Sequence, residues 1–371
     1  MLFALYAIPF VIFVRAVDYL EREPAILLAT AFAWGGLVAT SAALSGTAAL
    51  HEILAKAVSP AFAAAWGPAL AGPTTEEILK LLGVVIIALV AGSQINSVLD
   101  GFVYGALVGL GFQVVENIVF ALHAVDLAGG GDRAGPVVAT FLLRGFLGGL
   151  WSHTLFTALA GAGVGYFVVR RTRSRWHRFG IAAACFGVAW LCHFLWNSPL
   201  LGNGFGYGLP GVLAVILVKG IPALAMVLAL ARSAERLEGD YYSAILTSVA
   251  DPRIATPGEI RALVSLRTRL AARRLARARL GRRGARAVRR LQRAQAHLAV
   301  ELSRDPGAQV PGRQRDVLIR RHQLLAVGLA EARSPHRHPS LGPWLTIAVK
   351  LSGVILVAVA VGIAVRALGG G

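Results

Sequence analysis

The sequence predicts an all-α protein, a polytopic transmembrane helical bundle of about eight spans with a basic cytoplasmic helical insertion. Hydrophobic residues make up 56% of the 371 residues, and the mean hydropathy is +0.65. A soluble chain of this length would bury several apolar stretches, but it would not contain many that approach the thickness of a bilayer. The net charge is +18, yet the apolar stretches contain few cations, so the charge gathers in particular loops that orient the protein in the membrane.

The expected spans follow from the apolar stretches in chain order. Pro24 suits the first turn of the second helix, and the polar stretch 92–97 ends the third helix. Residues 45–73 are interrupted by Pro60 and Pro68, and we expect them to form an extracytoplasmic loop with an amphipathic helix. We expect spans at about residues 2–17, 25–43, 73–90, 100–124, 136–169, 179–197, 211–231 and 344–365.

Two of these stretches have internal features that predict more than a plain crossing. The stretch 100–124 is rich in glycine, which allows another helix to approach closely. The stretch 136–169 is too long for one simple crossing. It predicts a short helix, a break at Gly148 and Gly149, and then a second helix that contains His153.

The composition changes after residue 231, where the chain becomes polar and rich in arginine. Thr256 and Glu259 match a capping box, with a proline at the first helical position between them. We expect helices at about 257–280, 284–304 and 313–332. This segment and the basic loop 170–178 both qualify as cytoplasmic by the positive-inside rule, which puts both termini outside the cell. The expected parts are a seven-span membrane core at 1–231, a basic cytoplasmic helical domain at 232–342 and a C-terminal transmembrane span at 343–371, in the plasma membrane.

Glu76 and Glu77 stand together in an apolar stretch that continues to Val90. An ionisable side chain within a membrane costs about 2.5–3.5 kcal/mol on insertion scales, so two adjacent carboxylates require a reason. One reason is structural, because Lys80 lies three and four residues further on and can pair with either glutamate. The other reason is a water-filled site, which one of the two carboxylates would face.

More polar side chains occur inside other expected spans. Glu116 has apolar neighbours on both sides, and the structural alternative for it is a packing glutamate paired with Arg144. His153 lies in another expected span, and His193 shares a helical face with Asn197 four residues later. A lone intramembrane histidine is more often a hydrogen-bonded packing residue, but two histidines and several acids in apolar helices favour a reactive site.

These residue types suit the hydrolysis of a carbonyl compound. A desolvated carboxylate can act as a general base on water, histidine can share that proton transfer, and Asn197 can donate to a developing oxyanion. Glutamate and two histidines are also the ligands of a catalytic zinc site, in which case Glu76, His153 and His193 would hold the metal. The sequence contains no H-E-x-x-H motif and no G-x-S-x-G motif.

Four motifs in order resemble the PrsW family of bacterial intramembrane proteases, which is related to the CAAX-prenyl endopeptidases and the bacteriocin-processing membrane proteases. The link Glu21-x-Glu23-Pro24 is also similar to that family, and the resemblance covers roughly residues 1–231. The motifs are E-E-x-x-K at Glu76–Lys80, G-F-x-x-x-E-N at Gly111–Asn117, H-x-x-x-T at His153–Thr157 and H-x-x-x-N at His193–Asn197.

The resemblance implies cleavage of a membrane-anchored protein, such as an anti-sigma factor, near the outer face of the membrane. It implies that Glu76 is the general base and that Glu77 assists it or holds Lys80. Glu116 stands where the CAAX relatives have a histidine. The implied catalytic set is Glu76, Glu77, Glu116, His153, His193 and Asn197. A mechanism based on glutamate alone and one based on bound zinc both stay open.

The polar residues of the spans and the arginines of the segment 232–342 each allow another interpretation. A proton-coupled transporter or an immunity-type protein would also keep acids and histidines in its spans, but the sequence shows no internal repeat. The arginines of 232–342 match anionic lipid headgroups or packing between helices of this chain better than a protein partner, and a protein partner better than nucleic acid. Aromatic residues do not alternate with the arginines, and no DNA-binding motif is present.

Overall fold

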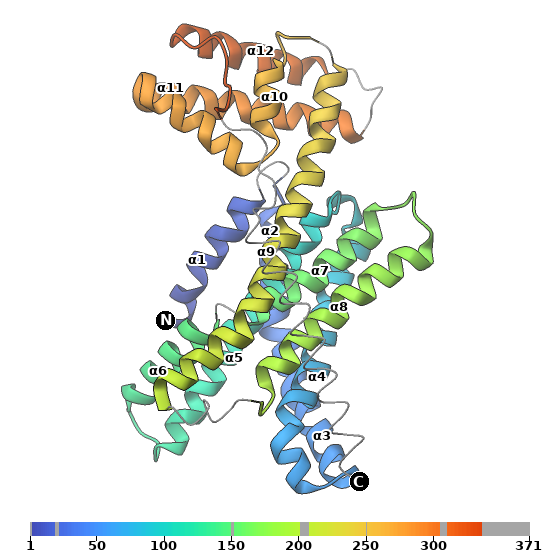
Figure 1. Ribbon diagram of the computed structural model, residues 1–371, viewed down its shortest axis with the longest axis vertical. Coiled ribbons are helices and arrows are strands. Elements are labelled where there is room, and N and C mark those ends of the chain that lie inside the picture. The colour runs from blue at the N-terminus through green and yellow to red at the C-terminus, as the bar shows by residue number, and fades with distance from the viewer. Residues whose placement is uncertain are drawn as a thin grey trace. The chain divides into compact units, whose positions relative to one another are not determined.

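The computed structural model describes residues 2–18, 22–149, 152–200, 208–249, 251–304 and 310–335, and every regular element within these ranges is a helix (Figure 1). The expected all-α class is confirmed. The described residues fall into two compact units. The first unit contains residues 2–14 and those from 23 to 230, and the second contains residues 15–18, Arg22 and those from 231 to 335. The expected C-terminal span lies outside the described residues.

Four helical stretches are long and apolar enough to cross a membrane, at residues 25–57, 98–127, 175–197 and 210–248. They comprise α2 (Ala25–Ala33), η1 (Trp34–Ala39) and α3 (Thr40–Ala57), then α5 (Val98–Leu127), α8 (Arg175–Asn197) and α9 (Gly208–Ser248). Shorter apolar helices cover residues 2–15, 134–145 and 153–169. These helices make the chain a membrane protein by length and composition, while the total of about eight spans stays a prediction.

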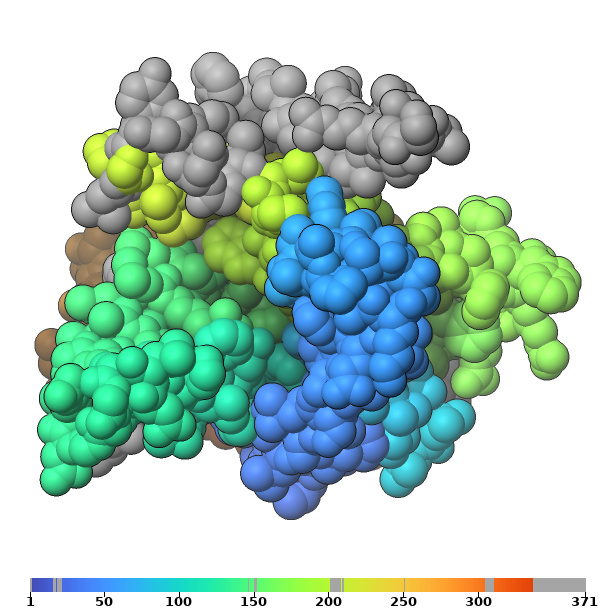
Figure 2. Space-filling model, turned by 90° about the horizontal axis from the view of Figure 1, so that it is seen from below, coloured from blue at the N-terminus to red at the C-terminus, as the bar shows by residue number. Residues whose placement is uncertain are grey.

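The expected extracytoplasmic loop at 45–73 is wrong, because α3 and α4 (Pro60–Val90) form a helical hairpin there. Figure 2 shows the end of this hairpin in blue. Ser59 caps α4 by accepting a hydrogen bond from Phe62 N at 3.1 Å, and Pro60 needs no donor at the first helical position. Pro73, expected at the start of a span, lies inside α4. The glutamate pair therefore lies near the middle of a 31-residue helix rather than near its end.

Close contact between α5 and α7 (His153–Val169) depends on glycine. A Cβ atom on Gly105 would come within 2.2 Å of Thr157 O, and one on Gly109 would come within 2.2 Å of His153 O. Side chains at these positions would force the two helices apart. The expectation that the glycines of this span admit another helix is confirmed, and the contact brings the start of α7 against α5.

The segment between α5 and α7 is also interrupted as expected. It contains α6 (Ala134–Thr140) and the π-helix η3 (Phe141–Gly148), and α7 then begins at His153. The break at Gly148 and Gly149 is confirmed, and it places His153 in the first turn of its helix.

The second unit is a helical domain with its own core. It contains the end of α9, then α10 (Pro257–Leu263), α11 (Leu266–Arg304) and α12 (Pro311–Ala326). Thr256 and Glu259 form the expected capping box. The expected single helix at 257–280 is wrong, since α10 ends before a short turn and α11 follows. The expected break near residue 281 is confirmed by a kink in α11, where Gly281 has a φ of 62°.

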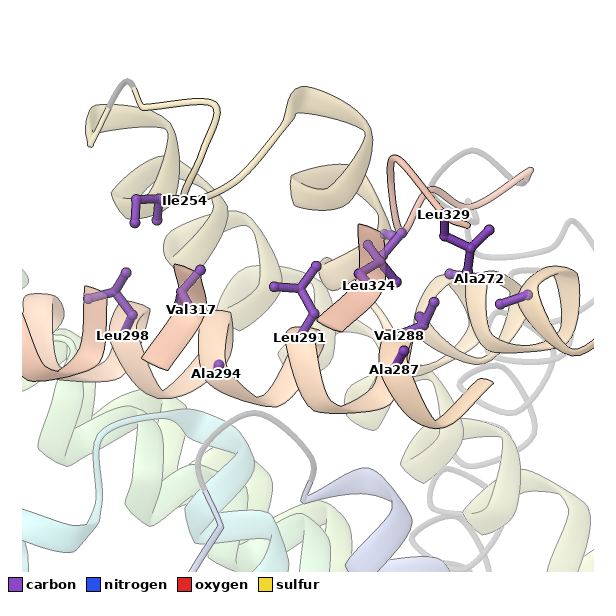
Figure 3. Packing of buried hydrophobic residues seen from close by; sticks show 13 residues of the cluster. Ile254, Ala272, Ala287, Val288, Leu291, Ala294, Leu298, Val317, Leu324 and Leu329 are labelled. Carbon is purple, nitrogen blue, oxygen red and sulfur yellow. The ribbon is translucent and has the colours of Figure 1, made fainter. Parts of the chain in front are cut away.

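Apolar side chains of α11 and α12 form most of this core (Figure 3). Leu291, Leu298, Val317 and Leu324 are fully buried between the two helices. Arg321 of α12 pairs with the buried carboxylate of Glu259, which ties α12 to the start of α10. The polar segment after residue 231 is therefore a folded domain with a buried interior, although its surface is rich in arginine.

Candidate active site

The polar side chains singled out in the expected spans converge at one buried place in the first unit. α4 supplies two glutamates and a lysine, α5 a third glutamate, α7 a histidine, and α8 a histidine and an asparagine. The most deeply buried are Glu76, Glu77, Lys80, His153 and His193, with exposed fractions of 8%, 0%, 0%, 5% and 1%. Buried ionisable groups persist only when they are paired or functional, so the contacts among them decide what the site can do.

Each histidine holds one ring nitrogen against a carboxylate. His153 Nε2 lies 2.8 Å from Glu116 Oε2, and His193 Nδ1 lies 2.8 Å from Glu77 Oε1. Each of these contacts places the ring proton on the nitrogen that faces the carboxylate. The other nitrogen of each ring, His153 Nδ1 and His193 Nε2, therefore carries a lone pair.

Both lone pairs have a donor in the structure. Lys80 Nζ lies 2.9 Å from His153 Nδ1, and it also donates to Glu77 Oε1 at 2.6 Å. Asn197 Nδ2 lies 3.2 Å from His193 Nε2 and donates to the carbonyl of Pro68 at 3.2 Å. These donors agree with the tautomers that the carboxylates favour, in which the lone pairs of the two rings are directed at the same place.

Glu76 faces those two nitrogens from α4. Its Oε2 lies 3.7 Å from His153 Nδ1 and 3.8 Å from His193 Nε2, and it accepts no hydrogen bond from any described residue. These distances are too long for direct hydrogen bonds. They are close to the separation of about 3.3 Å between neighbouring ligands of a tetrahedral zinc ion bound at about 2.0–2.1 Å.

The donor set fits a divalent metal ion such as zinc. The ligand atoms of Glu76, His153 and His193 all lie within 4.8 Å of one another. The carboxylates of Glu77 and Glu116 hold the opposite nitrogens of the two histidines, as outer carboxylates do in many zinc sites. The orphaned oxygen of Glu76 completes the set, so the residues present match the chemistry of a catalytic metal site with two histidines and one carboxylate.

The ion pairs that were the structural alternatives for the glutamates are also formed, within the same cluster. Lys80 does pair with Glu77, and Arg144 Nη2 lies 2.6 Å from Glu116 Oε2. The same carboxylates also contact the histidines, so pairing and site assembly are one network. The structure brings all six candidates together, namely Glu76, Glu77, Glu116, His153, His193 and Asn197.

Sequence reasoning missed the partners of two buried polar side chains. Gln113 of α5 is 1% exposed and contacts the start of α7, although it stands inside the G-F-x-x-x-E-N motif and is polar within an apolar helix. Glu23 is buried and accepts a hydrogen bond from Tyr104 Oη. Gln113 could have been singled out as a polar residue within an apolar helix, whereas Glu23 stands in a polar link, and only packing shows which partner each one has.

The family comparison matches a large part of this chain. The model of the PrsW family of intramembrane metalloproteases matches residues 23–227, which is more than half of the 371 residues. The match includes every residue of the site described above, and α1 (Leu2–Val17) lies outside it. No curated protein and no solved structure matches the chain. The chain belongs to the PrsW family of intramembrane metalloproteases.

Proposed function

We propose that this protein hydrolyses a peptide bond of a membrane-anchored protein at the place where Glu76, His153 and His193 meet. The observation that carries the proposal is the convergence of one orphaned carboxylate oxygen and two imidazole lone pairs from three different helices. Membership of a family of intramembrane proteases supports hydrolysis of a membrane protein as the activity.

The contacts suggest a separate task for each side chain. Glu76 Oε2 is the one carboxylate oxygen that faces both lone pairs, and it can take a proton from an attacking water. Glu77 is held by Lys80 and orients His193, while Glu116 is held by Arg144 and orients His153. These outer carboxylates fix ring orientation rather than attack the substrate.

Asn197 is the group placed to bind the oxygen of the attacked carbonyl. Its Nδ2 lies beside His193 Nε2 and the carbonyl of Pro68, and its side chain is partly exposed. A substrate carbonyl would take the place of one of these two acceptors. An amide donor at that point stabilises the negative charge that develops on the oxygen.

The residues that would hold a metal are Glu76, His153 and His193. A bound zinc ion would polarise the carbonyl and lower the pKa of bound water. His153 and His193 would each bind through the nitrogen that faces Glu76, because the carboxylates of Glu116 and Glu77 occupy the other side of the rings.

We expect purified protein to contain about one zinc ion per chain, because the donor set satisfies a zinc site. Metal content measured by mass spectrometry should fall to background in His193→Ala. His297→Ala is the matched control, since His297 is exposed on the helical domain. A strong chelator should remove the metal and stop cleavage. Metal-free protein with full, chelator-insensitive activity would show that Glu76 activates water without a metal.

The substrate we propose is a membrane-anchored protein such as an anti-sigma factor. Its support is the likeness of the four motifs, and no contact in the described residues selects one sequence over another. Comparing the ectodomains shed by wild-type cells and by Glu76→Ala cells identifies it. Absence of any difference would contradict a role in releasing ectodomains. The alternative of a proton-coupled transporter has no observation in its favour, because the polar side chains meet at one place.

We also propose that the second unit lies on the cytoplasmic side of the plasma membrane and contacts anionic lipid headgroups. The support is a cluster of four arginines within the second unit. Burial and the charges of Arg289, Arg293 and Arg22 lower the pKa of Arg273 to about 10. Arg22 belongs to the second unit with the other three arginines, and in the sequence it stands in the link between α1 (Leu2–Val17) and α2. Repelling cations at that position favour an anionic partner.

Lipid composition should therefore change the thermal stability of the protein through this cluster. In nanodiscs, replacing phosphatidylcholine with phosphatidylglycerol should raise the Tm of the wild type, since each arginine near an anionic surface contributes about 1 kcal/mol. The gain should largely vanish in a triple variant that replaces Arg273, Arg289 and Arg293 with glutamine. Arg282→Gln is the control, as this exposed arginine lies outside the cluster. An equal gain in the triple variant would contradict the proposal.

A further inference from the structure

Gln113 uses its whole side-chain amide at the start of α7. Its Nε2 donates to the carbonyl of Gly149 at 2.9 Å and to Tyr6 Oη at 2.5 Å. Its Oε1 accepts from Thr154 Oγ1 at 3.0 Å and from Thr154 N at 3.4 Å. A glutamine amide has two N–H donors and one oxygen with two lone pairs, so these contacts occupy its full capacity.

These contacts fall where a helix most needs outside partners. The first N–H groups of an α-helix have no partner within the helix. Ser152 precedes α7 and makes no side-chain cap, whereas Gln113 accepts from the backbone N–H of Thr154 in the first turn. Gln113 thus caps α7 from a neighbouring helix, and His153 immediately precedes Thr154, the residue whose backbone N–H donates to Gln113.

Tyr6 fixes the other side of this glutamine. Tyr6 is 8% exposed and lies on α1, which is outside the stretch that matches the family model. A Cβ atom on Gly149 would come within 2.0 Å of Tyr6 Oη and within 2.5 Å of Gln113 Nε2. The backbone at Gly149 is therefore packed directly against both side chains, and a residue larger than glycine would push them away.

We propose that Gln113 and Tyr6 are positioning residues that set the first turn of α7 and, through it, the ring of His153. One helix then holds His153 at two points. Glu116 of α5 contacts its ring, and Gln113, three residues earlier on α5, contacts the backbone on both sides of it. Neither Gln113 nor Tyr6 contacts Glu76 or His193 in any described hydrogen bond or ion pair. This inference rests on the proposed role of His153, and it makes α1 part of the active unit.

The proposal is tested by a measurement that reports on His153 directly. The ¹⁵N chemical shifts of histidine rings, recorded on the full chain in nanodiscs and assigned with His153→Ala and His193→Ala, show which ring nitrogen carries a proton. Tyr6→Phe and Gln113→Leu should both shift the His153 signals, and they should shift them more than the His193 signals. Unchanged His153 signals in both variants would overturn the proposal, whether or not the protein proves to be a protease.

The second readout is the rate of shedding of the ectodomains that depend on Glu76. A displaced His153 should lower that rate by about 10–100-fold in Gln113→Leu, with a smaller loss in Tyr6→Phe. The double variant should be no slower than Gln113→Leu, since both changes act through one contact. Tyr166→Phe is the matched control, because Tyr166 lies at the far end of α7 against His177. Additive losses in the double variant would contradict action through a shared contact.

If Gln113→Leu fails to fold, Tyr6→Phe still decides the matter, because it removes one hydroxyl and keeps the ring. Failure of the proteolytic function itself looks different. In that case no ectodomain depends on Glu76, yet the His153 signals still respond to Tyr6→Phe. The two ideas are therefore tested separately.

Discussion

Replacing Glu76 with glutamine should stop proteolysis, with a loss of at least about 10³-fold in the rate of substrate cleavage. Glu76 Oε2 is the buried oxygen that faces His153 Nδ1 and His193 Nε2, and no described residue donates to it. A glutamine keeps the shape of the side chain, but it can neither take a proton from water nor provide a charged ligand to a metal. His153→Ala and His193→Ala should be inactive for related reasons, since each removes one of the two inward lone pairs.

The fold should survive this change. Glu76 Oε2 accepts no hydrogen bond in the described part of the chain, and Lys80, which lies 3.8 Å from it, keeps its shorter contact with Glu77 at 2.6 Å. The Tm of Glu76→Gln should therefore stay within a few degrees of the wild type. Glu52→Gln is the matched control, as Glu52 is an exposed acid on α3. The measurement is cleavage of a shed substrate by purified protein in nanodiscs, together with thermal unfolding. Full cleavage by Glu76→Gln would refute the proposed site.

Replacing Lys80 with methionine should destabilise the protein by about 3–5 kcal/mol, the usual cost of leaving one buried charge without its partner. Lys80 and Glu77 are both 0% exposed, and Lys80 Nζ lies 2.6 Å from Glu77 Oε1. Methionine has a similar volume and can pack against Phe112, over which the ammonium now lies at 4.4 Å. The expected loss therefore comes from the carboxylate that stays behind rather than from a cavity.

A second substitution should reverse most of this loss. In the double variant Glu77→Gln with Lys80→Met, both charges of the Lys80–Glu77 pair are gone, and the amide oxygen can still accept from His193 Nδ1, which now lies 2.8 Å from Glu77 Oε1. We expect the free energies of the two single variants to be strongly non-additive in a double-mutant cycle. Thermal unfolding in detergent measures the stability of each variant, with Lys56→Met on the exposed side of α3 as the control. A Lys80→Met protein as stable as the double variant would show that Glu77 does not need the ammonium.

The sequence predicted the α3–α4 region badly for a physical reason. Pro60 and Pro68 indicated a loop, and Pro73 the start of a span, because proline lacks an N–H donor and disrupts a helix interior. In the structure the first of them starts α4, and the other two lie inside it. Membrane helices tolerate such prolines where neighbouring helices support them, as α3 and α8 can do for α4. The sequence alone does not show which helices pack against α4, so it could not predict that these prolines are tolerated inside a helix.

Sequence alone determined the class of the protein and the residue types of its site. Charged and imidazole side chains are costly in apolar helices, so Glu76, Glu116, His153 and His193 stand out without any structure. Helical spacing also indicated that Lys80 could reach Glu77, and the contact at 2.6 Å confirms it. Both inferences are possible because the free-energy cost of a charged side chain in an apolar helix, and the spacing of side chains along that helix, depend on a single helix.

Tertiary structure decided how these groups face one another. That His153 turns Nε2 to Glu116 and Nδ1 to Lys80, and that Gln113 reaches back to Tyr6, depends on contacts between residues 37 to 107 positions apart. Those contacts exist because glycines on α5 let the start of α7 approach its backbone. Ring orientation and hydrogen-bond partners are set by packing between helices, and no pattern within one helix encodes them.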